Sequence, residues 1–297
     1  MSDKIMVTGG AGFVGTHLVR ELTERGYEVF SFDIKNDPHQ DITNYEAIKR
    51  YIMSWKPDIV FHLAANPRVD LSFKNPIKDF EVNALGTLNL LRALKDRPVK
   101  LVFTSTAHVY GEPCYLPIDE AHPISPRSPY AISKYAAERY CLVYGRRHGI
   151  QVTIIRLFNT YGPGQGPGFV IPDLVHKLVK NPNRLVVRGT GKEVRDFVYI
   201  SDVVSALVKA MSNGEDGECY NVGSGVGVSI SELVSLLIDI LGLRSCEVTF
   251  EGSSVAGTPS TIIADITKAK NHLRWTPIIS LKEGLKLSLK GIEFPWK

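Results

Sequence analysis

Short apolar runs alternate with helical patterns through the first half of the chain. The runs lie at 4–9, 27–33, 58–64, 100–105 and 151–157, and the helical patterns at 15–26, 44–54, 76–96 and 127–148. The runs are apolar almost throughout instead of alternating between apolar and polar, which is typical of strands that are covered on both faces of a sheet. Strand–helix–strand repetition of this kind predicts an α/β fold with a parallel sheet and right-handed crossovers.

The pattern changes after residue 158. Glycine and proline crowd into 159–168 ("NTYGPGQGPG"), and short mixed elements follow. We therefore expect one large domain over 1–158 and a smaller, less regular lobe over 159–297, with some elements of that lobe returning to the main sheet.

Composition and charge exclude several classes of protein. The chain has 297 residues, of which 44% are hydrophobic and 22% charged, as in an ordinary globular protein. A net charge of +4 with scattered basic residues argues against a nucleic-acid partner. No apolar run approaches the roughly 20 residues that cross a bilayer, and no secretory signal is recognisable, so we expect no membrane partner. The four cysteines lie far apart without metal-ligand spacing, and we interpret them as reduced thiols in a cytoplasmic protein that has no metal site: Cys114, Cys141, Cys219 and Cys246.

A glycine loop lies between the first predicted strand and the first predicted helix. The segment 7–15 ("VTGGAGFVG") places glycines at positions 9, 12 and 15. A loop without side chains lets a pyrophosphate approach the backbone and the N-terminus of the following helix. Gly9, Gly12 and Gly15 would then serve the turn, the close approach and the helix packing respectively, which predicts a dinucleotide site.

An acidic residue ends the second predicted strand at Asp33, 18 residues beyond Gly15. A carboxylate at this place accepts hydrogen bonds from both ribose hydroxyls and repels a 2′-phosphate, so it favours NAD over NADP. Lys35 weakens that preference, and Asp33 could instead be a turn residue. Asp41 and Ile42 ("HQDITN") could flank the adenine, although an Asp here is also an ordinary helix start.

Four segments occur in a familiar order: "TGGAGFVG", "FHLAA" (61–65), "YAISK" (130–134) and "RDFVYISD" (195–202). Together they resemble the extended short-chain dehydrogenases/reductases, specifically the NAD-dependent epimerase/dehydratase family and its UDP-glucose 4-epimerase-like group. The resemblance covers about residues 4 to 285. It implies a Rossmann-type doubly wound parallel sheet, an NAD-binding domain over 1–158 and a mainly substrate-binding lobe over 159–297.

The resemblance gives roles to three residues. Tyr130 is the acid–base and Lys134 sets its ionisation, which agrees with physical chemistry. The two side chains lie four residues apart on one helix face, and an ammonium beside a phenol, with the positive nicotinamide ring, lowers the phenol pKa from about 10. Thr106 takes the position of the catalytic serine or threonine, with Ser105 as the near alternative. These hydroxyls could also merely complete the end of a strand.

The resemblance also implies a set of residues that contact NAD. They come from the glycine loop, the ends of the predicted strands and the catalytic helix: Gly9, Gly12, Phe13, Val14, Gly15, Asp33, Asp41, Ile42, Ala64, Ala65, Asn83, Thr104, Tyr130 and Lys134. Asn83 matches the asparagine that orients the backbone of the active site.

The residues that follow Thr106 bear on the reaction. Sugar 4,6-dehydratases of this family carry an Asp-Glu pair there, which supplies an acid and a base for eliminating water, and related decarboxylases place Glu at the second position. Here the two positions are Ala107 and His108. The expected outcome is therefore 4-epimerisation, in which a keto-sugar turns over and takes the hydride back on its other face. His108 could be a proton relay or a substrate contact, although a lone histidine in such a loop is more often a structural hydrogen bonder.

Further positions match family contacts to a nucleotide sugar. The expected substrate-binding residues are Lys74, Thr106, Ala107, His108, Tyr130, Asn159 and Arg195. Asn159 and Arg195 would hold the diphosphate or the sugar, Arg195 through its bidentate fork. Each could instead be a surface charge or a cap.

The sequence departs from the family before "IIADITKAK" (262–270). Relatives usually carry an Arg-x-Gly-Asp stretch there that grips phosphate and ribose, whereas this chain has "VAGT" at 255–258. Ile262 falls where glucose-specific relatives carry a bulky tyrosine, so N-acetylated UDP-sugars are also expected as substrates. The competing hypotheses are a reductase or dehydratase of nucleotide sugars and a non-catalytic dinucleotide-binding regulator. By resemblance we expect a homodimer that pairs through the helices at 76–96 and 127–148.

Overall fold

The computed structural model describes residues 3–95, 97–252 and 257–292. Within these ranges six strands form one sheet in the order β2-β1-β3-β4-β5-β9, and every neighbouring pair is parallel. The strands are β1 (Lys4–Thr8), β2 (Glu28–Phe32), β3 (Ile59–His62), β4 (Lys100–Thr106), β5 (Gln151–Leu157) and β9 (Cys219–Val222). The five strands expected from the apolar runs are thus confirmed to within about two residues at each end.

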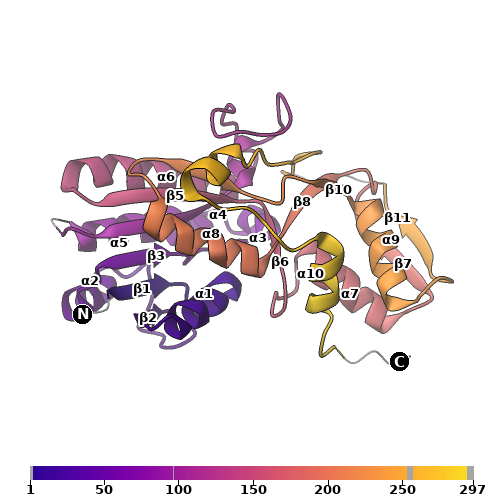
Figure 1. Ribbon diagram of the computed structural model, residues 1–297, viewed down its shortest axis with the longest axis horizontal. Coiled ribbons are helices and arrows are strands. Elements are labelled where there is room, and N and C mark those ends of the chain that lie inside the picture. Colours follow the sequence, from indigo (N-terminus) through magenta and orange to yellow (C-terminus); the bar gives the residue numbers. More distant parts are fainter. Residues whose placement is uncertain (1–2, 96, 253–256, 293–297) are drawn as a thin grey trace.

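Helices cover both faces of this sheet (Figure 1). On one face lie α1 (Phe13–Glu24) and α8 (Ile200–Asn213), and on the other α2 (Tyr45–Trp55), α5 (Gly86–Leu94) and α6 (Pro129–His148). Successive residues of a strand point to opposite faces, so Ile5 and Val7 join the first core whereas Met6 joins the second. The sheet is therefore doubly wound, as predicted.

The predicted helix at 76–96 is correct in position but not in form. It is a run of α4 (Pro76–Phe80), the π-helical turn η1 (Glu81–Leu85) and α5. A π turn inserts a residue into a helix and re-aims its side chains. Here it directs Asn83 into the interior, where its side chain is fully buried and hydrogen-bonded to Asn66 and Ser133.

The chain after residue 158 divides between two places. α8 and β9 return to the large sheet, while α7 (Val170–Lys180), β7 (Arg184–Val187), α9 (Ile230–Leu241) and β11 (Glu247–Phe250) form a separate lobe on the right of Figure 1. A three-stranded sheet of β10 (Gly227–Ser229), β8 (Val194–Tyr199) and β6 (Asn159–Tyr161) lies between the two parts. The remaining elements are α3 (Val69–Lys74), η2 (Ala107–Tyr110), η3 (Ala269–Leu273) and α10 (Leu281–Ser288).

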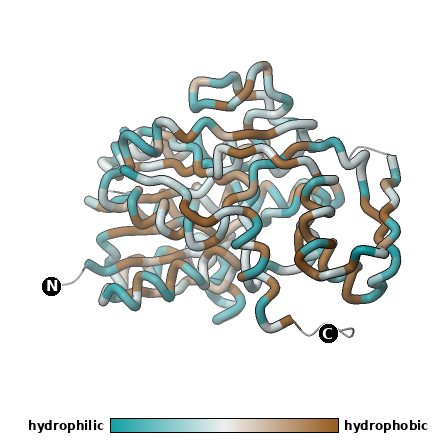
Figure 2. The backbone as a smooth tube through the Cα atoms, turned by 45° about the vertical axis from the view of Figure 1, so that its right-hand side comes forward, coloured by the Kyte–Doolittle hydropathy of each residue, from teal (hydrophilic) through white to brown (hydrophobic). Residues whose placement is uncertain are grey.

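Hydrophobic segments follow the strands inside the molecule, whereas hydrophilic ones predominate on its outer turns (Figure 2). None of the helices in the described ranges is long and apolar enough to cross a membrane. The four cysteines carry free thiols, as expected.

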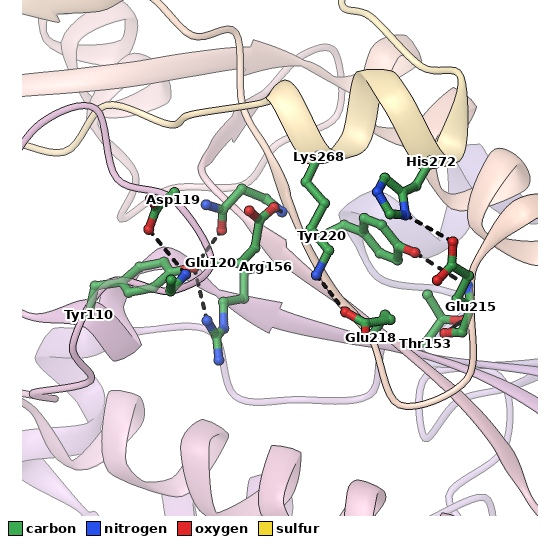
Figure 3. A network of polar contacts seen from close by, with 12 residues as sticks. Tyr110, Asp119, Glu120, Thr153, Arg156, Glu215, Glu218, Tyr220, Lys268 and His272 are labelled. Carbon is green, nitrogen blue, oxygen red and sulfur yellow. Dashed lines mark hydrogen bonds and ion pairs between the residues drawn. The ribbon is translucent and has the colours of Figure 1, made fainter.

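A network of polar contacts joins η2 and β5 to β9 (Figure 3). The Arg156 guanidinium donates to both Glu138 oxygens, at 3.0 and 2.7 Å, and to the Tyr110 hydroxyl at 2.9 Å. The Tyr110 hydroxyl in turn donates to Asn221 Oδ1 at 2.7 Å, and Glu120 accepts from the Asn221 backbone at 2.7 Å. The network therefore ties β5 and α6 to β9 and to the long loop after η2.

The order of the strands locates the site. β1 and β3 are neighbours in the sheet, but the chain runs outward from β1 to β2 on one side and onward from β3 to β4 on the other. Ligands of such sheets bind beyond the carboxyl ends of the strands at this switch point.

Candidate active site

A cavity of about 1110 Å³ opens at the carboxyl ends of the main strands. Its walls come from the β1–α1 turn and the ends of β3, β4 and β5 on one side, and from α7, β7 and β8 of the smaller lobe on the other. The volume exceeds the roughly 300–1,000 Å³ of a typical single-ligand pocket, so it has room for two ligands side by side.

The glycine loop lines one end of this cavity. Gly9 has φ +73°, and a Cβ there would lie 2.6 Å from the Ala64 nitrogen, while a Cβ on Gly15 would lie 2.1 Å from the Gly9 carbonyl. Gly12 donates its N–H to the Gly9 carbonyl at 3.0 Å and caps α1. The helix begins at Phe13, two residues earlier than predicted, so Phe13, Val14 and Gly15 form its first turn. The loop thus has the bare backbone and helix N-terminus that a pyrophosphate requires.

Asp33 lies beside the glycine loop on the cavity wall and is only 8% exposed. Its Oδ2 accepts from the Ala11 N–H at 3.0 Å and its Oδ1 from the Lys35 N–H at 2.8 Å. Each carboxylate oxygen has two lone pairs, so both retain capacity for ribose hydroxyls. The residue therefore stiffens the loop and still presents acceptors to a ligand.

Asp41 and Ile42 also line the cavity. The Asp41 carboxylate accepts from the N–H and the hydroxyl of Thr43, both at 2.8 Å, whereas Asn44 caps α2. Asp41 thus shapes a turn before the helix without capping it. Ile42 packs closely against Gly86, where a Cβ would meet its side chain at 2.8 Å.

The three predicted catalytic residues meet at the centre of the cavity wall. Thr106 ends β4, and Tyr130 lies in the first turn of α6, which Ser128 caps by accepting from the Ala131 N–H and Pro129 opens. Lys134 follows one turn later and is 2% exposed. The Thr106 hydroxyl interacts with the Tyr130 phenol, and this interaction lowers the phenol pKa. Of the two candidate hydroxyls, Thr106 and not Ser105 is therefore the one that contacts the phenol.

Burial governs the ionisation of this pair. It raises the pKa of Tyr130 to about 12, with the Thr106 hydrogen bond acting in the opposite direction. It lowers the pKa of Lys134 to about 8, against the charges of Cys141, Glu138 and Asp79. Burial of the phenol thus dominates its pKa in the polypeptide by itself, and the expected lowering by Lys134 together with the nicotinamide ring stays a prediction for the NAD-bound protein. The polypeptide holds Tyr130 as a neutral phenol.

A buried hydrogen-bond network lies beneath the catalytic turn of α6. The Ser133 hydroxyl donates to Asp79 Oδ2 at 2.6 Å, and the Asn66 amide donates to Asp79 Oδ1 at 3.2 Å. Asn83 donates to Ser133 at 3.0 Å and accepts from the Asn66 backbone at 2.8 Å. Asp79 and Asn83 are fully buried, and burial raises the pKa of Asp79. The network holds the turn that carries Tyr130 and Lys134.

Two features of this network differ from the sequence interpretation. Asn83 orients the backbone near Asn66, as the resemblance implied, but it does not line the cavity and so is not placed to contact NAD directly. Asp79 is absent from the predicted site residues. The available signal was an acidic residue on the helix face that also carries Asn83, four positions later.

His108 follows Thr106 in η2 and lines the cavity. The backbone N–H of His108 donates to the Thr106 hydroxyl at 3.2 Å. The imidazole ring lies edge-on to the ring of Tyr130, with centroids 6.2 Å apart. Its Nδ1 is sealed from solvent without a hydrogen-bond partner, as is the Ser105 hydroxyl. The interpretation of His108 as a structural hydrogen bonder is therefore not supported, since its ring bonds to no described residue.

The predicted substrate residues do not all reach the cavity. Ala107, Asn159 and Arg195 line it, as do Ala64, Ala65 and Thr104 among the residues expected at NAD. Arg195 donates to the Val194 carbonyl at 2.8 Å and to the Ser260 carbonyl at 3.1 Å. Lys74 is exposed at the end of α3 and does not line the cavity, so its contact with the substrate stays a prediction. Ile262, 1% exposed, is also absent from the cavity wall, and the acceptance of N-acetyl sugars stays a prediction.

The smaller lobe supplies residues that were not predicted. Lys177 on α7 and Arg188 after β7 line the cavity, and Lys177 donates to the Val186 carbonyl at 2.8 Å. Arg188 has no ion pair within the described ranges. No local pattern marks these cations, because only the packing of the lobe against the sheet brings them to the cavity. Of the departing segment at 255–258, residues 255 and 256 lie outside the described residues, and Thr258 lines the cavity.

Comparison with known proteins decides the family. The family model "NAD dependent epimerase/dehydratase family" matches residues 5–223. A protein named as a putative UDP-glucose 4-epimerase from Methanocaldococcus jannaschii is 38% identical over 95% of this chain and 96% of its own length. The chain belongs to the NAD-dependent epimerase/dehydratase family. The predicted cofactor, NAD, is thereby confirmed at the level of the family.

Solved structures of this family share the whole fold. The UDP-glucose 4-epimerase of Thermotoga maritima with UDP-glucose has a TM-score of 0.90 and 36% identity, covering 97% of both chains. The UDP-glucose 4-epimerase of Thermus thermophilus with NAD has a TM-score of 0.88 and 34% identity, covering 98% of this chain and 100% of its own. Family members of other activity also match: a UDP-glucuronic acid decarboxylase of Arabidopsis thaliana, a dTDP-D-glucose 4,6-dehydratase of Bos taurus and a GDP-6-deoxy-D-mannose reductase of Pseudomonas aeruginosa. The family is thus established, and the reaction within it is not.

Proposed function

We propose that the protein epimerises a nucleotide sugar at carbon 4, with UDP-glucose and UDP-galactose, or their N-acetyl forms, as substrates. The observation that carries the proposal is the catalytic end of the cavity. Tyr130, Thr106 and Lys134 converge there, while Ala107 and His108 occupy the two places where a dehydratase carries its acid and base. The site thus has the groups for oxidation at carbon 4, but it lacks the acid and base for elimination of water at these two places.

The chain's own residues supply binding and proton transfer. NAD, held at the glycine loop and Asp33, would supply the acceptor and donor of the hydride of the sugar carbon. Tyr130 and Thr106 hold the hydroxyl of that carbon between them, and Tyr130 takes its proton during oxidation and gives it back during reduction. Lys134, close by on the same helix face, stabilises the phenolate that forms.

The two ligands would divide the cavity between the two parts of the molecule. The glycine loop, Asp33, Asp41 and Ile42 line the end that suits a dinucleotide. Asn159 and Arg195 line the opposite side, where the diphosphate of the sugar nucleotide would lie. Lys177 and Arg188 of the smaller lobe would add positive charge for the same diphosphate.

The decisive experiment follows the sugar without any added cofactor. The purified protein is incubated with UDP-galactose, UDP-glucose and their N-acetyl counterparts, and the products are followed by proton NMR. We expect interconversion at carbon 4 in the wild type and none in Tyr130→Phe. A deoxy-keto product, or turnover only with added NADH, would replace epimerisation by a dehydratase or a reductase activity.

The proposal includes a homodimer. Large apolar side chains are exposed along the run from α4 to η1 and along α6: Ile77, Phe80, Leu85, Ile132, Tyr140 and Val143. Exposed apolar groups that gather on neighbouring helices are typical of an interface between proteins. We expect Ile132→Glu combined with Val143→Glu to convert a dimer into a monomer by analytical ultracentrifugation, whereas a wild type that is already monomeric would contradict the dimer. The cytoplasmic location stays a prediction.

A further inference from the structure

We propose that His108 determines specificity by hydrogen-bonding a neutral hydroxyl group of the sugar, on carbon 3 or carbon 6, whose hydroxyls lie on either side of the reacting carbon 4. This inference rests on the proposed function, because it takes the hydroxyl of the reacting carbon to lie between Tyr130 and Thr106. It adds a substrate class to that function: sugars with a hydroxyl at this neighbouring position are preferred over those with a hydrogen or a carboxylate there.

The position of the ring follows from one short turn of chain. The backbone N–H of His108 donates to the Thr106 hydroxyl, which also interacts with the Tyr130 phenol. The same turn therefore sets both the hydroxyl that faces the reacting carbon and the imidazole. With its ring centroid 6.2 Å from that of Tyr130, His108 reaches beside the reacting carbon and not onto it.

The ring nitrogens of His108, which is partly buried, differ from those of the fully buried His62 and His122. His62 has a hydroxyl partner on each nitrogen, at 2.6 and 2.9 Å, and His122 bonds to the backbone through both of its nitrogens, at 2.9 Å each. In His108, Nδ1 is sealed and without a partner, whereas Nε2 is not sealed and bonds to no described residue. A buried polar group is normally paired, so the unpaired ring of a cavity wall calls for a ligand.

The charge state of the ring selects the kind of ligand. Burial, and secondly the charge of Arg195, lowers the pKa of His108 to about 4, so the ring is neutral at pH 7. A neutral imidazole offers a donor or an acceptor at its open nitrogen, depending on the tautomer. A hydroxyl pairs with either tautomer, whereas a carboxylate only accepts and finds no imidazolium to compensate for its desolvation.

The test measures binding, so that it does not depend on turnover. Affinities of UDP-glucose, its 3-deoxy and 6-deoxy forms and UDP-glucuronic acid are measured by calorimetry for the NAD-loaded Tyr130→Phe protein, with and without His108→Leu. We expect His108→Leu to weaken the binding of UDP-glucose by about 10-fold and to leave the affinity for one of the two deoxy forms unchanged. That form identifies the carbon whose hydroxyl His108 binds. His108→Gln, whose side-chain amide supplies a donor and an acceptor in place of the imidazole, should restore most of the affinity.

One control variant separates a loss of stability from a loss of sugar binding. His122→Leu removes a buried histidine outside the cavity wall and should change stability without changing the ranking of the sugars. The inference is overturned if His108→Leu weakens the binding of all four ligands equally, or if the Leu and Gln variants have the same affinities. It is also overturned if UDP-glucuronic acid binds most tightly and loses the most affinity in His108→Leu. Because these results concern affinity, they are distinct from a failure of the NMR assay, which would remove the proposed reaction.

Discussion

Two buried polar regions are built from the same two stretches of chain, the end of β4 with η2 and the helix α6, and they differ in one respect. In the network of Figure 3, Tyr110 and Arg156 are bonded to each other and to further groups of the chain. At the cavity, two turns of chain away, Ser105 and His108 have sealed polar atoms without partners. Lys134 lies over the Phe103 ring at 4.2 Å and forms no ion pair in the described part of the chain.

This difference separates groups that hold the fold from groups that await a ligand. An unpaired buried polar atom costs about 1–3 kcal/mol of folding free energy. All three side-chain nitrogens of Arg156 are paired, whereas Ser105 Oγ and His108 Nδ1 are unpaired in residues of the cavity wall, which a ligand would cover. Changes in the network should therefore act on stability, and changes at the cavity on binding and activity.

The largest expected effect is on activity. Tyr130→Phe removes the acid–base group and should lower kcat by about 10²- to 10⁴-fold. The free energy of unfolding should change by less than about 1 kcal/mol, since the change removes at most the interaction of the phenol with the Thr106 hydroxyl. Steady-state kinetics and urea denaturation measure the two quantities. If the variant kept a tenth of the wild-type activity, Tyr130 would not be the catalytic acid–base.

The next effect is on stability. Glu138→Ala leaves the Arg156 guanidinium buried and without its carboxylate, 2.7 Å away in the wild type, and should cost about 3–5 kcal/mol of unfolding free energy. Lys268→Ala is the matched control, because its pair with Glu218 is partly exposed and should be worth at most about 1 kcal/mol. Urea midpoints report both. Equal losses in the two variants would contradict the distinction between buried and exposed pairs.

The third prediction concerns the pH dependence of stability. It compares His62, whose two ring nitrogens are paired, with His108, whose ring is unpaired. Burial, with the charge of Lys134, lowers the pKa of His62 from 6.5 to about 3. Its contribution to stability is therefore fully present above pH 6.5 and is lost as pH falls from 6.5 toward 3, by up to about 1.4 kcal/mol per pH unit. His62→Gln should lose less stability than the wild type on acidification from pH 6.5 to 5, by urea denaturation. Parallel curves would show that His62 is not the titrating group.

The smallest expected effect concerns the network under the catalytic turn. Asp79→Asn retains one acceptor oxygen for two donors, Ser133 and Asn66, so one hydrogen bond is lost, at about 1 kcal/mol of stability. Because the turn carries Tyr130 and Lys134, kcat should also fall while KM for the sugar stays within about 2-fold. Glu81→Gln, in the same helical run but at the surface, serves as the control. A change in KM alone would exclude a positioning role for Asp79.

Much of the fold and part of the site were predictable because they depend on neighbours in the chain. Buried strands are recognisable as apolar runs in the sequence. Tyr130 and Lys134 share a helix face because they are four residues apart. The glycine loop was recognisable for the same reason, since Gly9 and Gly15 meet within one turn. The sequence by itself thus determined the doubly wound sheet, the dinucleotide loop and the catalytic pair.

The tertiary structure decided the rest. It brought Lys177 and Arg188 to the cavity, left Lys74 and Ile262 away from it, and put Asp79 under the catalytic turn. It also closed the environment of His108, so that one nitrogen is sealed and the ring stays neutral. These outcomes depend on contacts between segments far apart in the chain, and on the water that those contacts exclude. No local period or spacing encodes either of them.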